Sequence, residues 1–277
     1  MLFPCPLKTC AFFLLITASL MAAEPERQPQ PLKIVAHRGL LLHAPENTLV
    51  NFKVCLELKL GFEVDVRRSK DGQLVCVHDD TVDRTTNGSG AVVEMTVEQL
   101  KKLDAGGWFD ETFAKQRIPT MGEVFALVAE YPAAAGLIAV DIKGEDERIE
   151  KDLVALAQQH KVLNRLLFIG RAINTPDVRR RLRQASKEAA VACVANTAEE
   201  LGAAIADENS TWVYVRFLPT AAQVAQAHQA GKPVFIAGPT VAGHLPVNWQ
   251  TAVDSGLDAV LTDHPLELRR LMRQPAR

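Results

Sequence analysis

Ile34-Val35-Ala36-His37-Arg38-Gly39 is a short apolar run that ends in polar side chains, and a helical pattern follows it over residues 47–60. This unit repeats along the chain, because short β-branched or apolar runs alternate with stretches of helical periodicity. Strands are expected at residues 32–36, 62–66, 137–141, 166–169, 191–194, 212–215, 234–236 and 259–261. Helices are expected at residues 47–60, 121–130, 146–160, 177–186, 198–207, 221–230, 249–255 and 266–272.

Eight strand-helix units predict a (β/α)8 barrel, for which about 250 residues is typical. A doubly wound open sheet is the main alternative. Such a sheet usually carries a glycine-rich phosphate loop after its first strand, and Gly39 alone does not provide one. The number of units therefore favours the barrel, which we expect to fill residues 32–277 as one domain.

A hairpin is predicted after the second strand, since Lys70-Asp71-Gly72-Gln73 separates two alternating runs at residues 66–69 and 74–77. Folding the chain about this turn sets His78 opposite Asp65. Residues 80–117 are rich in threonine, glycine and charge, with a short helix expected at 97–103. We interpret them as a small insertion over the barrel mouth, where functional loops collect.

The N-terminus has the features of a secretory signal: Lys8 is an early charge, residues 11–21 are apolar, and Met21-Ala22-Ala23 offers small residues for cleavage. A retained anchor is the alternative, but the apolar run is short for a membrane span. We therefore expect a signal peptide at 1–23, an exposed proline-rich lead-in at 24–31, and an exported protein, periplasmic or secreted, with no stable membrane span after cleavage.

The composition limits the partners of the chain. Of its 277 residues 48% are hydrophobic and 23% are charged, and the formal net charge is -2. Because no basic run or aromatic-basic ladder is present, nucleic acid is not an expected partner. The cysteines that remain after cleavage, at positions 55, 76 and 193, are too few and too scattered for a disulfide framework. The sequence carries no signal for an oligomeric state.

Glu63 and Asp65 alternate with Val64, so both carboxylates point to the same face of the second strand. Their mutual repulsion needs compensation, which one hard divalent cation, Mg²⁺ or Ca²⁺, would supply through oxygen ligands. Asp141 ends another apolar run, and Lys143 lies two residues on, in the positions of a third ligand and a phosphate-binding cation. The alternatives are a solvated polar strand face and an ordinary surface ion pair.

His37 and Arg38 follow the first strand directly, where barrel enzymes place catalytic groups. An arginine fork matches two phosphate oxygens, and histidine exchanges a proton near neutral pH. His78 adds a second proton-transfer group, so that one histidine can act as base while the other protonates a leaving oxygen.

Several short motifs together resemble the glycerophosphodiester phosphodiesterase family. They are His37-Arg38-Gly39, Pro45-Glu46-Asn47-Thr48, Glu63-Val64-Asp65-Val66, Lys70-Asp71-Gly72, His78-Asp79, Asp83-Arg84-Thr85-Thr86-Asn87-Gly88, Arg117-Ile118-Pro119-Thr120, Asp141-Ile142-Lys143 and Leu261-Thr262-Asp263-His264-Pro265. The resemblance implies a (β/α)8 barrel with an insertion, and a metal-dependent hydrolase that cleaves small glycerophosphodiesters into glycerol 3-phosphate and an alcohol.

The resemblance also implies roles for single residues. These are the acid-base pair His37 and His78, the phosphate contacts Arg38 and Lys143, and the metal ligands Glu63 and Asp65. Glu46 and Asn47 would orient the first histidine or the substrate, with helix capping as the alternative. Asp141 stands where the family more often has glutamate, so the third ligand would be one methylene shorter.

Two other functions remain open. The same site could cleave a lysophospholipid, for which the insertion offers the apolar side chains of Trp108, Phe109 and Phe113. A non-catalytic exported binding protein is the second alternative, favoured by Asp141 and by later strands that lack the family's signatures. Arg171 and Arg216 follow predicted strands and could meet an anionic substrate, although ordinary surface arginines are at least as common.

Overall fold

The computed structural model describes residues 1, 31–132, 136–144 and 146–273. The predicted signal peptide at 1–23 and the lead-in at 24–31 therefore lie outside the described residues, apart from Met1 and Pro31. No helix among the described residues is long and apolar enough to cross a membrane.

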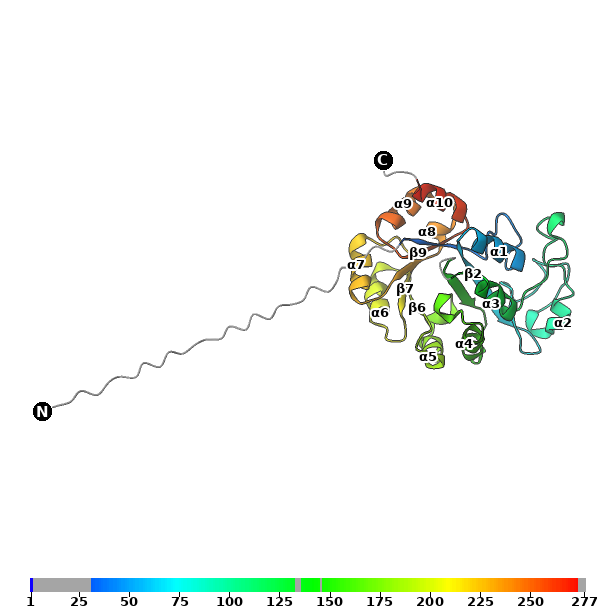
Figure 1. Cartoon of the computed structure of the whole chain (residues 1–277), viewed down its shortest axis with the longest axis horizontal. Helices are drawn as coiled ribbons and strands as arrows, with labels where there is room; N and C mark the ends of the chain where they lie inside the picture. Colours follow the sequence, from blue (N-terminus) through cyan, green and yellow to red (C-terminus); the bar gives the residue numbers. More distant parts are fainter. Residues whose placement is uncertain (2–30, 133–135, 145, 274–277) are drawn as a thin grey trace. The chain divides into compact units, whose positions relative to one another are not determined.

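Eight parallel strands form the centre of the domain (Figure 1). They are β1 (Lys33–Ala36), β2 (Gly61–Arg68), β4 (Ile138–Ile142), β5 (Leu166–Ile169), β6 (Ala192–Ala195), β7 (Trp212–Val215), β8 (Val234–Ile236) and β9 (Ala259–Thr262). Their order is β5-β4-β2-β1-β9-β8-β7-β6, and an isolated parallel bridge from Phe168 to Val191 joins the two ends of this order. The sheet is a nearly closed barrel, which confirms the predicted (β/α)8 fold.

Helices follow the strands along the chain (Figure 1). The longer ones are α1 (Leu49–Glu57), α3 (Met121–Ala129), α4 (Ile149–Gln159), α5 (Pro176–Ala185), α6 (Leu201–Ala206), α7 (Ala221–Gln229), α9 (Pro246–Asp254) and α10 (Pro265–Met272). Short helical turns are α2 (Val97–Leu100), α8 (Pro239–Ala242) and 3-10 segments at Val92–Glu94, Glu111–Phe113, Leu163–Arg165, Ala172–Asn174 and Ala198–Glu200. The buried side chains of the long helices and the strands form one continuous apolar core, as the strand-helix repeat requires.

The predicted hairpin is present, with β3 (Leu74–Cys76) antiparallel to β2, but its register differs from the expectation by one residue. Val66 pairs with Cys76 and Arg68 with Leu74, so the register points to Val77 rather than His78 opposite Asp65. The reason is that Ser69 belongs to the turn: its N–H donates to Gln73 O at 2.9 Å and its hydroxyl accepts from Gln73 N at 3.0 Å.

The segment after the hairpin has a small apolar core of its own. Its buried side chains come from the hairpin and from the predicted insertion, namely Val75, Val77, Val82, Val92, Leu100, Ala105 and Ile118. Antiparallel bridges from Thr81 to Ala91 and from Val75 to Thr120 fasten the segment to itself and to β3. The segment is therefore packed against the hairpin, next to the residues that follow β3.

Candidate active site

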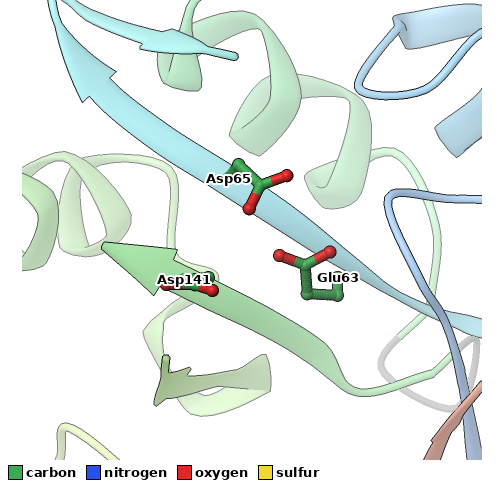
Figure 2. A group of neighbouring side chains, drawn as sticks. All are labelled: Glu63, Asp65 and Asp141. Atoms are coloured by element: carbon green, nitrogen blue, oxygen red, sulfur yellow. The ribbon is translucent and has the colours of Figure 1, made fainter. Parts of the chain in front are cut away.

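Three carboxylates meet where β2 and β4 run side by side (Figure 2). Glu63 and Asp65 lie on β2, and Asp141 on β4 pairs with Asp65 in the parallel register. One oxygen from each of the three lies within 4.8 Å of the others. Glu63 and Asp65 are 2% and 1% exposed, which rules out the alternative of a solvated polar strand face.

Burial and mutual repulsion raise the pKa values in this cluster, while the neighbouring cations lower them. Burial, with the charges of Asp65 and Asp141, raises the pKa of Glu63 well above its usual range. Burial together with Asp65 raises the pKa of Asp141 to about 6, although Lys143 opposes the shift. Burial would also raise the pKa of Asp65, but Lys143 and Arg38 outweigh it and lower that pKa. Asp65 is thus the member most firmly held as a carboxylate.

The donor set fits a hard divalent cation. Three carboxylates offer only oxygen ligands, which Mg²⁺ and Ca²⁺ prefer. Oδ1 of Asp141 is buried and accepts no hydrogen bond from any described residue; Oδ1 of Asp65 also accepts none, with Lys143 Nζ 3.2 Å away. Buried oxygens are normally satisfied, so these two are suited to a cation between the strands.

Two basic side chains border the cluster. Lys143 follows β4 directly, and its Nζ lies 2.7 Å from Asp141 Oδ2. Arg38 follows β1, and its Nε lies 3.6 Å from Asp65 Oδ2. Arg38 has a φ of +52°, a left-handed conformation that is costly for a non-glycine residue, and its N–H donates to Glu63 Oε2 at 2.9 Å. The strained turn therefore places the arginine beside the carboxylates.

Glu46 and Asn47 both contact this site. Asn47 Nδ2 donates to Asp65 Oδ2 at 2.8 Å, and its Oδ1 accepts from the Asp65 N–H at 3.1 Å. Glu46 Oε1 accepts from Arg38 Nη1 at 3.0 Å. Thr48, at the N-cap of α1, makes no capping hydrogen bond with its side chain. Asn47 and Thr48 thus do not cap the helix with their side chains, and the contacts of Glu46 and Asn47 within this site go to Arg38 and Asp65 rather than to His37.

Each of the two histidines is hydrogen-bonded to a carboxylate through Nδ1. His37 Nδ1 lies 2.7 Å from Asp263 Oδ1, and His78 Nδ1 lies 2.7 Å from Asp79 Oδ1. Among the described residues neither Nε2 has a hydrogen-bond partner, and the side chains are 28% and 32% exposed. Both histidines also influence the cluster. His78 contributes to the lowered pKa of Asp65, and His37 opposes the rise in the pKa of Asp141.

A groove of about 930 Å³ extends from the site. His78 and Lys143 line it at the site, and the segments after β4 and β5 line it further out. Most of its side chains are charged, including Arg67, Asp146, Glu147, Glu150, Asp177 and Arg181, while Ile142, Ala172 and Val178 are its larger apolar contributions. Arg171 lies in this groove, whereas Arg216 does not line it.

The sequence pattern did not single out Asp263 or Arg84. Asp263 directly follows β9, at the same end of the barrel as His37. Arg84 lies in the insertion and hydrogen-bonds both Glu46 and Asp79. Both residues lie in motifs that carry the family resemblance, but no role was expected for either. The contact of Arg84 with Glu46 joins residues 38 positions apart, which spacing alone does not reveal.

Comparisons with known proteins agree with the geometry. A family model, the glycerophosphoryl diester phosphodiesterase family, matches residues 37–267. A glycerophosphodiester phosphodiesterase of Caldanaerobacter subterraneus is 54% identical over 98 residues, 35% of this chain and 40% of that protein. One from Bacillus subtilis is 35% identical over 151 residues, 50% of this chain and 49% of that protein. The alignments thus span about half or less of these relatives.

Solved structures resemble the barrel over more of its length. The glycerophosphodiester phosphodiesterase of Agrobacterium tumefaciens has a TM-score of 0.71 at 25% identity, covering 84% of this chain and 97% of that one. An Oleispira antarctica phosphodiesterase, solved with its product sn-glycerol-3-phosphate, has a TM-score of 0.69 at 25% identity, covering 87% and 97%. With a family model that runs from His37 after the first strand to Glu267 in the last helix, this chain belongs to the glycerophosphoryl diester phosphodiesterase family.

Proposed function

We propose that this protein hydrolyses glycerophosphodiesters to glycerol 3-phosphate and an alcohol by metal-dependent acid-base catalysis. The observation that carries the proposal is the convergence of three buried carboxylates, two basic side chains and two carboxylate-bonded histidines. Of these residues, His78 and Lys143 line the groove. Family membership supports the same reaction.

Glu63, Asp65 and Asp141 would hold one divalent cation, Mg²⁺ or Ca²⁺. When bound, such an ion neutralises charge on the phosphodiester and on the transition state. Asp141 has a shorter side chain than Glu63, but its pairing with Asp65 across β2 and β4 brings its carboxylate into the cluster. Asn47 fixes Asp65 with two hydrogen bonds, one to its carboxylate and one from its backbone N–H.

Arg38 and Lys143 are placed to bind the phosphate oxygens. Both touch the carboxylate cluster, and the guanidinium of Arg38 can offer its fork to two oxygens at once. Glu46 orients that guanidinium through Arg38 Nη1. The charge that develops on the phosphoryl oxygens in the transition state is thus met by preorganised cations.

His37 and His78 are placed to move the two protons of the reaction. One Nε2 accepts a proton from the nucleophile, which is water or the glycerol hydroxyl next to the phosphate. Attack by water gives glycerol 3-phosphate directly, whereas attack by the hydroxyl gives a cyclic phosphate that water must then open. The other Nε2 donates a proton to the oxygen of the departing alcohol. Asp263 and Asp79 hold the Nδ1 atoms and thereby orient each ring with Nε2 available.

The groove favours a polar alcohol arm over an acyl chain. Its lining is dominated by charged side chains, most of them in ion pairs such as Arg181 with Glu150 and Arg67 with Asp80. An acyl chain gains little from such a surface. Trp108 of the insertion is 39% exposed and its indole N–H donates to Ala105 O, within the insertion itself. We therefore favour small glycerophosphodiesters over lysophospholipids.

The complete set of residues supports an enzyme over the alternative of a binding protein. A pocket that only binds a diester needs no pair of oriented histidines, yet both are hydrogen-bonded to carboxylates. We also propose that the protein is exported, on the strength of residues 1–23 alone. Cell fractionation of the tagged protein, with and without residues 2–23, tests this: retention of the full-length protein in the cytoplasm would contradict it.

One experiment tests the function. The purified protein is incubated with glycerophosphocholine, glycerophosphoethanolamine or lysophosphatidylcholine, with Mg²⁺, Ca²⁺ or EDTA, and glycerol 3-phosphate and free alcohol are assayed. We expect metal-dependent release of glycerol 3-phosphate from the first two substrates. His37→Asn and His78→Asn should lose about 10²-fold or more of the rate, whereas His160→Asn, after α4, should not. Cleavage of the lysophospholipid alone would favour the lipid alternative, and metal binding without turnover would favour the binding protein.

A further inference from the structure

Arg84 contacts two carboxylates at once from within the insertion. Its Nη1 donates to Glu46 Oε2 at 2.8 Å and its Nη2 to Glu46 Oε1 at 2.8 Å. Its Nε donates to Asp79 Oδ2 at 2.7 Å, and Nη2 also reaches Asp79 Oδ1 at 3.2 Å. One guanidinium thus bridges the loop after β1 and the loop after β3.

The two carboxylates lead to different parts of the site. Glu46 Oε1 also accepts from Arg38 Nη1 at 3.0 Å, and Asp79 Oδ1 also bonds His78 Nδ1 at 2.7 Å. A continuous series of hydrogen bonds therefore runs from Arg38 through Glu46, Arg84 and Asp79 to His78. Neither end of the series bonds the other directly among the described residues, so Arg84 is the link between them.

We propose that Arg84 is a positioning residue that fixes the phosphate-binding Arg38 and the proton-transferring His78 relative to each other. This inference rests on the function proposed above. It gives the insertion a direct part in the reaction, because the segment supplies the group that sets the distance between a phosphate contact and a catalytic histidine.

The geometry requires an arginine at this position. A guanidinium is planar and offers donors on two edges, so that it can bind one carboxylate on each. A lysine supplies the same charge from a single nitrogen with three donors, and it cannot reproduce the four hydrogen bonds, two to each carboxylate, that the guanidinium makes. The three groups also stabilise one another's charged forms. Hydrogen bonds to Glu46 and Asp79 raise the pKa of Arg84, and Arg84 in turn lowers the pKa of Asp79.

The structure explains why Glu46 depends on this contact. Its side chain is only 9% exposed, and burial alone would raise its pKa; Arg84 and Arg38 together lower it. Without Arg84, Arg38 is the remaining cation in contact with Glu46, and the second carboxylate oxygen loses its partner. We expect Arg38 to be drawn toward Glu46 and away from the substrate phosphate.

The test compares Arg84→Lys and Arg84→Gln with a matched control, Arg117→Gln. Arg117 lies in the same insertion and donates to Leu103 O at 2.9 Å, away from the site residues. We expect both Arg84 variants to lower kcat by about 10–100-fold, since misplacement of reacting groups by about 1 Å costs that order. KM should rise several-fold, and the melting temperature should change no more than in the control.

A double-mutant cycle separates positioning from general destabilisation. If Glu46 and Arg84 act through the same series of hydrogen bonds, the kcat of the double variant Arg84→Gln/Glu46→Gln should be little lower than that of the more impaired single variant. Three outcomes would each overturn the proposal. The first is a wild-type kcat in Arg84→Lys, and the second is full additivity of the kcat losses of Arg84→Gln and Glu46→Gln. The third is a loss of kcat that parallels the fall in melting temperature in the Arg84 variants and in Arg117→Gln alike.

A binding measurement keeps this test independent of turnover. Titration calorimetry with sn-glycerol 3-phosphate, in the presence of Ca²⁺, should show several-fold weaker binding for Arg84→Gln and unchanged binding for Arg117→Gln. If the wild type binds glycerol 3-phosphate without cleaving any diester, the proposed reaction fails while the role of Arg84 is still decided. Equal binding by wild type and Arg84→Gln would count against that role.

Discussion

Asp141 lies directly opposite Asp65 across the pairing of β2 with β4, and the ammonium of Lys143 lies 2.7 Å from one carboxylate and 3.2 Å from the other. Two buried carboxylates in adjacent positions repel each other, and Lys143 supplies part of the compensating charge. The same two carboxylates are two of the three proposed metal ligands. We therefore expect Lys143 and a bound cation to compete for these carboxylates until a substrate phosphate binds the ammonium.

Replacing Lys143 tests this competition. Lys143→Met should tighten Ca²⁺ binding by several-fold in the absence of substrate, because the carboxylates lose a competing cation. The same substitution should lower turnover by about 10-fold or more, because the contact with the substrate phosphate is lost. Calorimetry with Ca²⁺ and the glycerol 3-phosphate assay measure the two effects. Lys232→Met, which removes a lysine bonded to Asp207 O and Ser210 Oγ, should change neither. Weaker Ca²⁺ binding in Lys143→Met would contradict the competition.

Gly170 provides a way to displace one ligand without altering any carboxylate. It follows β5 with a φ of +98°, and a Cβ built there would lie 1.8 Å from Asp141 Oδ1. Gly170→Ala should therefore push Asp141 out of the cluster and weaken divalent-metal binding by about 10-fold or more, as loss of a supporting contact does in other metal sites.

Gly72 is the matched control for this change. It has a φ of +85° in the hairpin turn, and a Cβ there would meet nothing within 4 Å. Both substitutions carry the strain of a left-handed residue, about 1 kcal/mol, but only that at Gly170 meets a ligand. Calorimetry with Mg²⁺ and Ca²⁺ should separate them; equal metal affinity in the two variants would remove Asp141 from the ligand set.

Asp263 offers a third test, through the ring of His37. Asp263→Asn keeps the shape of the side chain but replaces the carboxylate that bonds His37 Nδ1. The amide stabilises an imidazolium less well and can hold the wrong tautomer, so kcat should fall by about 10–100-fold, less than the loss of His37 itself. Steady-state kinetics on glycerophosphocholine measures this. A variant with unchanged kcat but raised KM would mean that Asp263 contacts substrate instead.

The sequence predicted the barrel because its parallel strands are buried on both faces and read as apolar runs. β5, β7 and β8 have the predicted bounds, whereas β4 and β6 each begin and end one residue later than predicted. At β6 the reason is that Val191 forms only an isolated bridge. α9 begins at Pro246 rather than at 249, and α8 was not predicted, because proline starts both helices where the pattern was read as loop.

The site was predictable where it depends on one strand and not where it depends on loops. Glu63 and Asp65 had to share a face, since side chains alternate along a strand. The hairpin register was wrong by one residue because a turn's length is set by local hydrogen bonds, here those of Ser69. The contact of Arg84 with Glu46 and that of Asp263 with His37 join residues 38 and 226 positions apart, and spacing carries no signal for them.

The stability of the barrel should depend on an ion pair remote from the carboxylate cluster. Arg179 on α5 bonds Asp207, after α6, with Nε–Oδ1 at 3.2 Å and Nη2–Oδ2 at 2.6 Å, and the side chains are 7% and 16% exposed. Burial would raise the pKa of Asp207, but Arg179 and Lys232 outweigh it and lower the pKa. The folded state therefore stabilises the charged form of Asp207 relative to the unfolded state.

The sign of the pH dependence follows from that lowered pKa. The contribution of the pair is complete above the ordinary aspartate pKa of about 3.9 and is lost as the pH falls through the lower folded value. Asp207→Asn should lower the free energy of unfolding by about 2 kcal/mol at pH 7. This is less than the ~3–5 kcal/mol expected when a fully buried pair is broken, because Arg179 keeps its hydrogen bonds to Ile173 O and Asn174 O. Urea unfolding from pH 7 to pH 3 should show the wild type converging on the variant below about pH 4. As a control, substitution of the exposed Asp254 by Asn should change the free energy of unfolding by no more than about 0.5 kcal/mol at pH 7. A difference in unfolding free energy between wild type and Asp207→Asn that is the same at every pH would show that the charge of Asp207 contributes nothing.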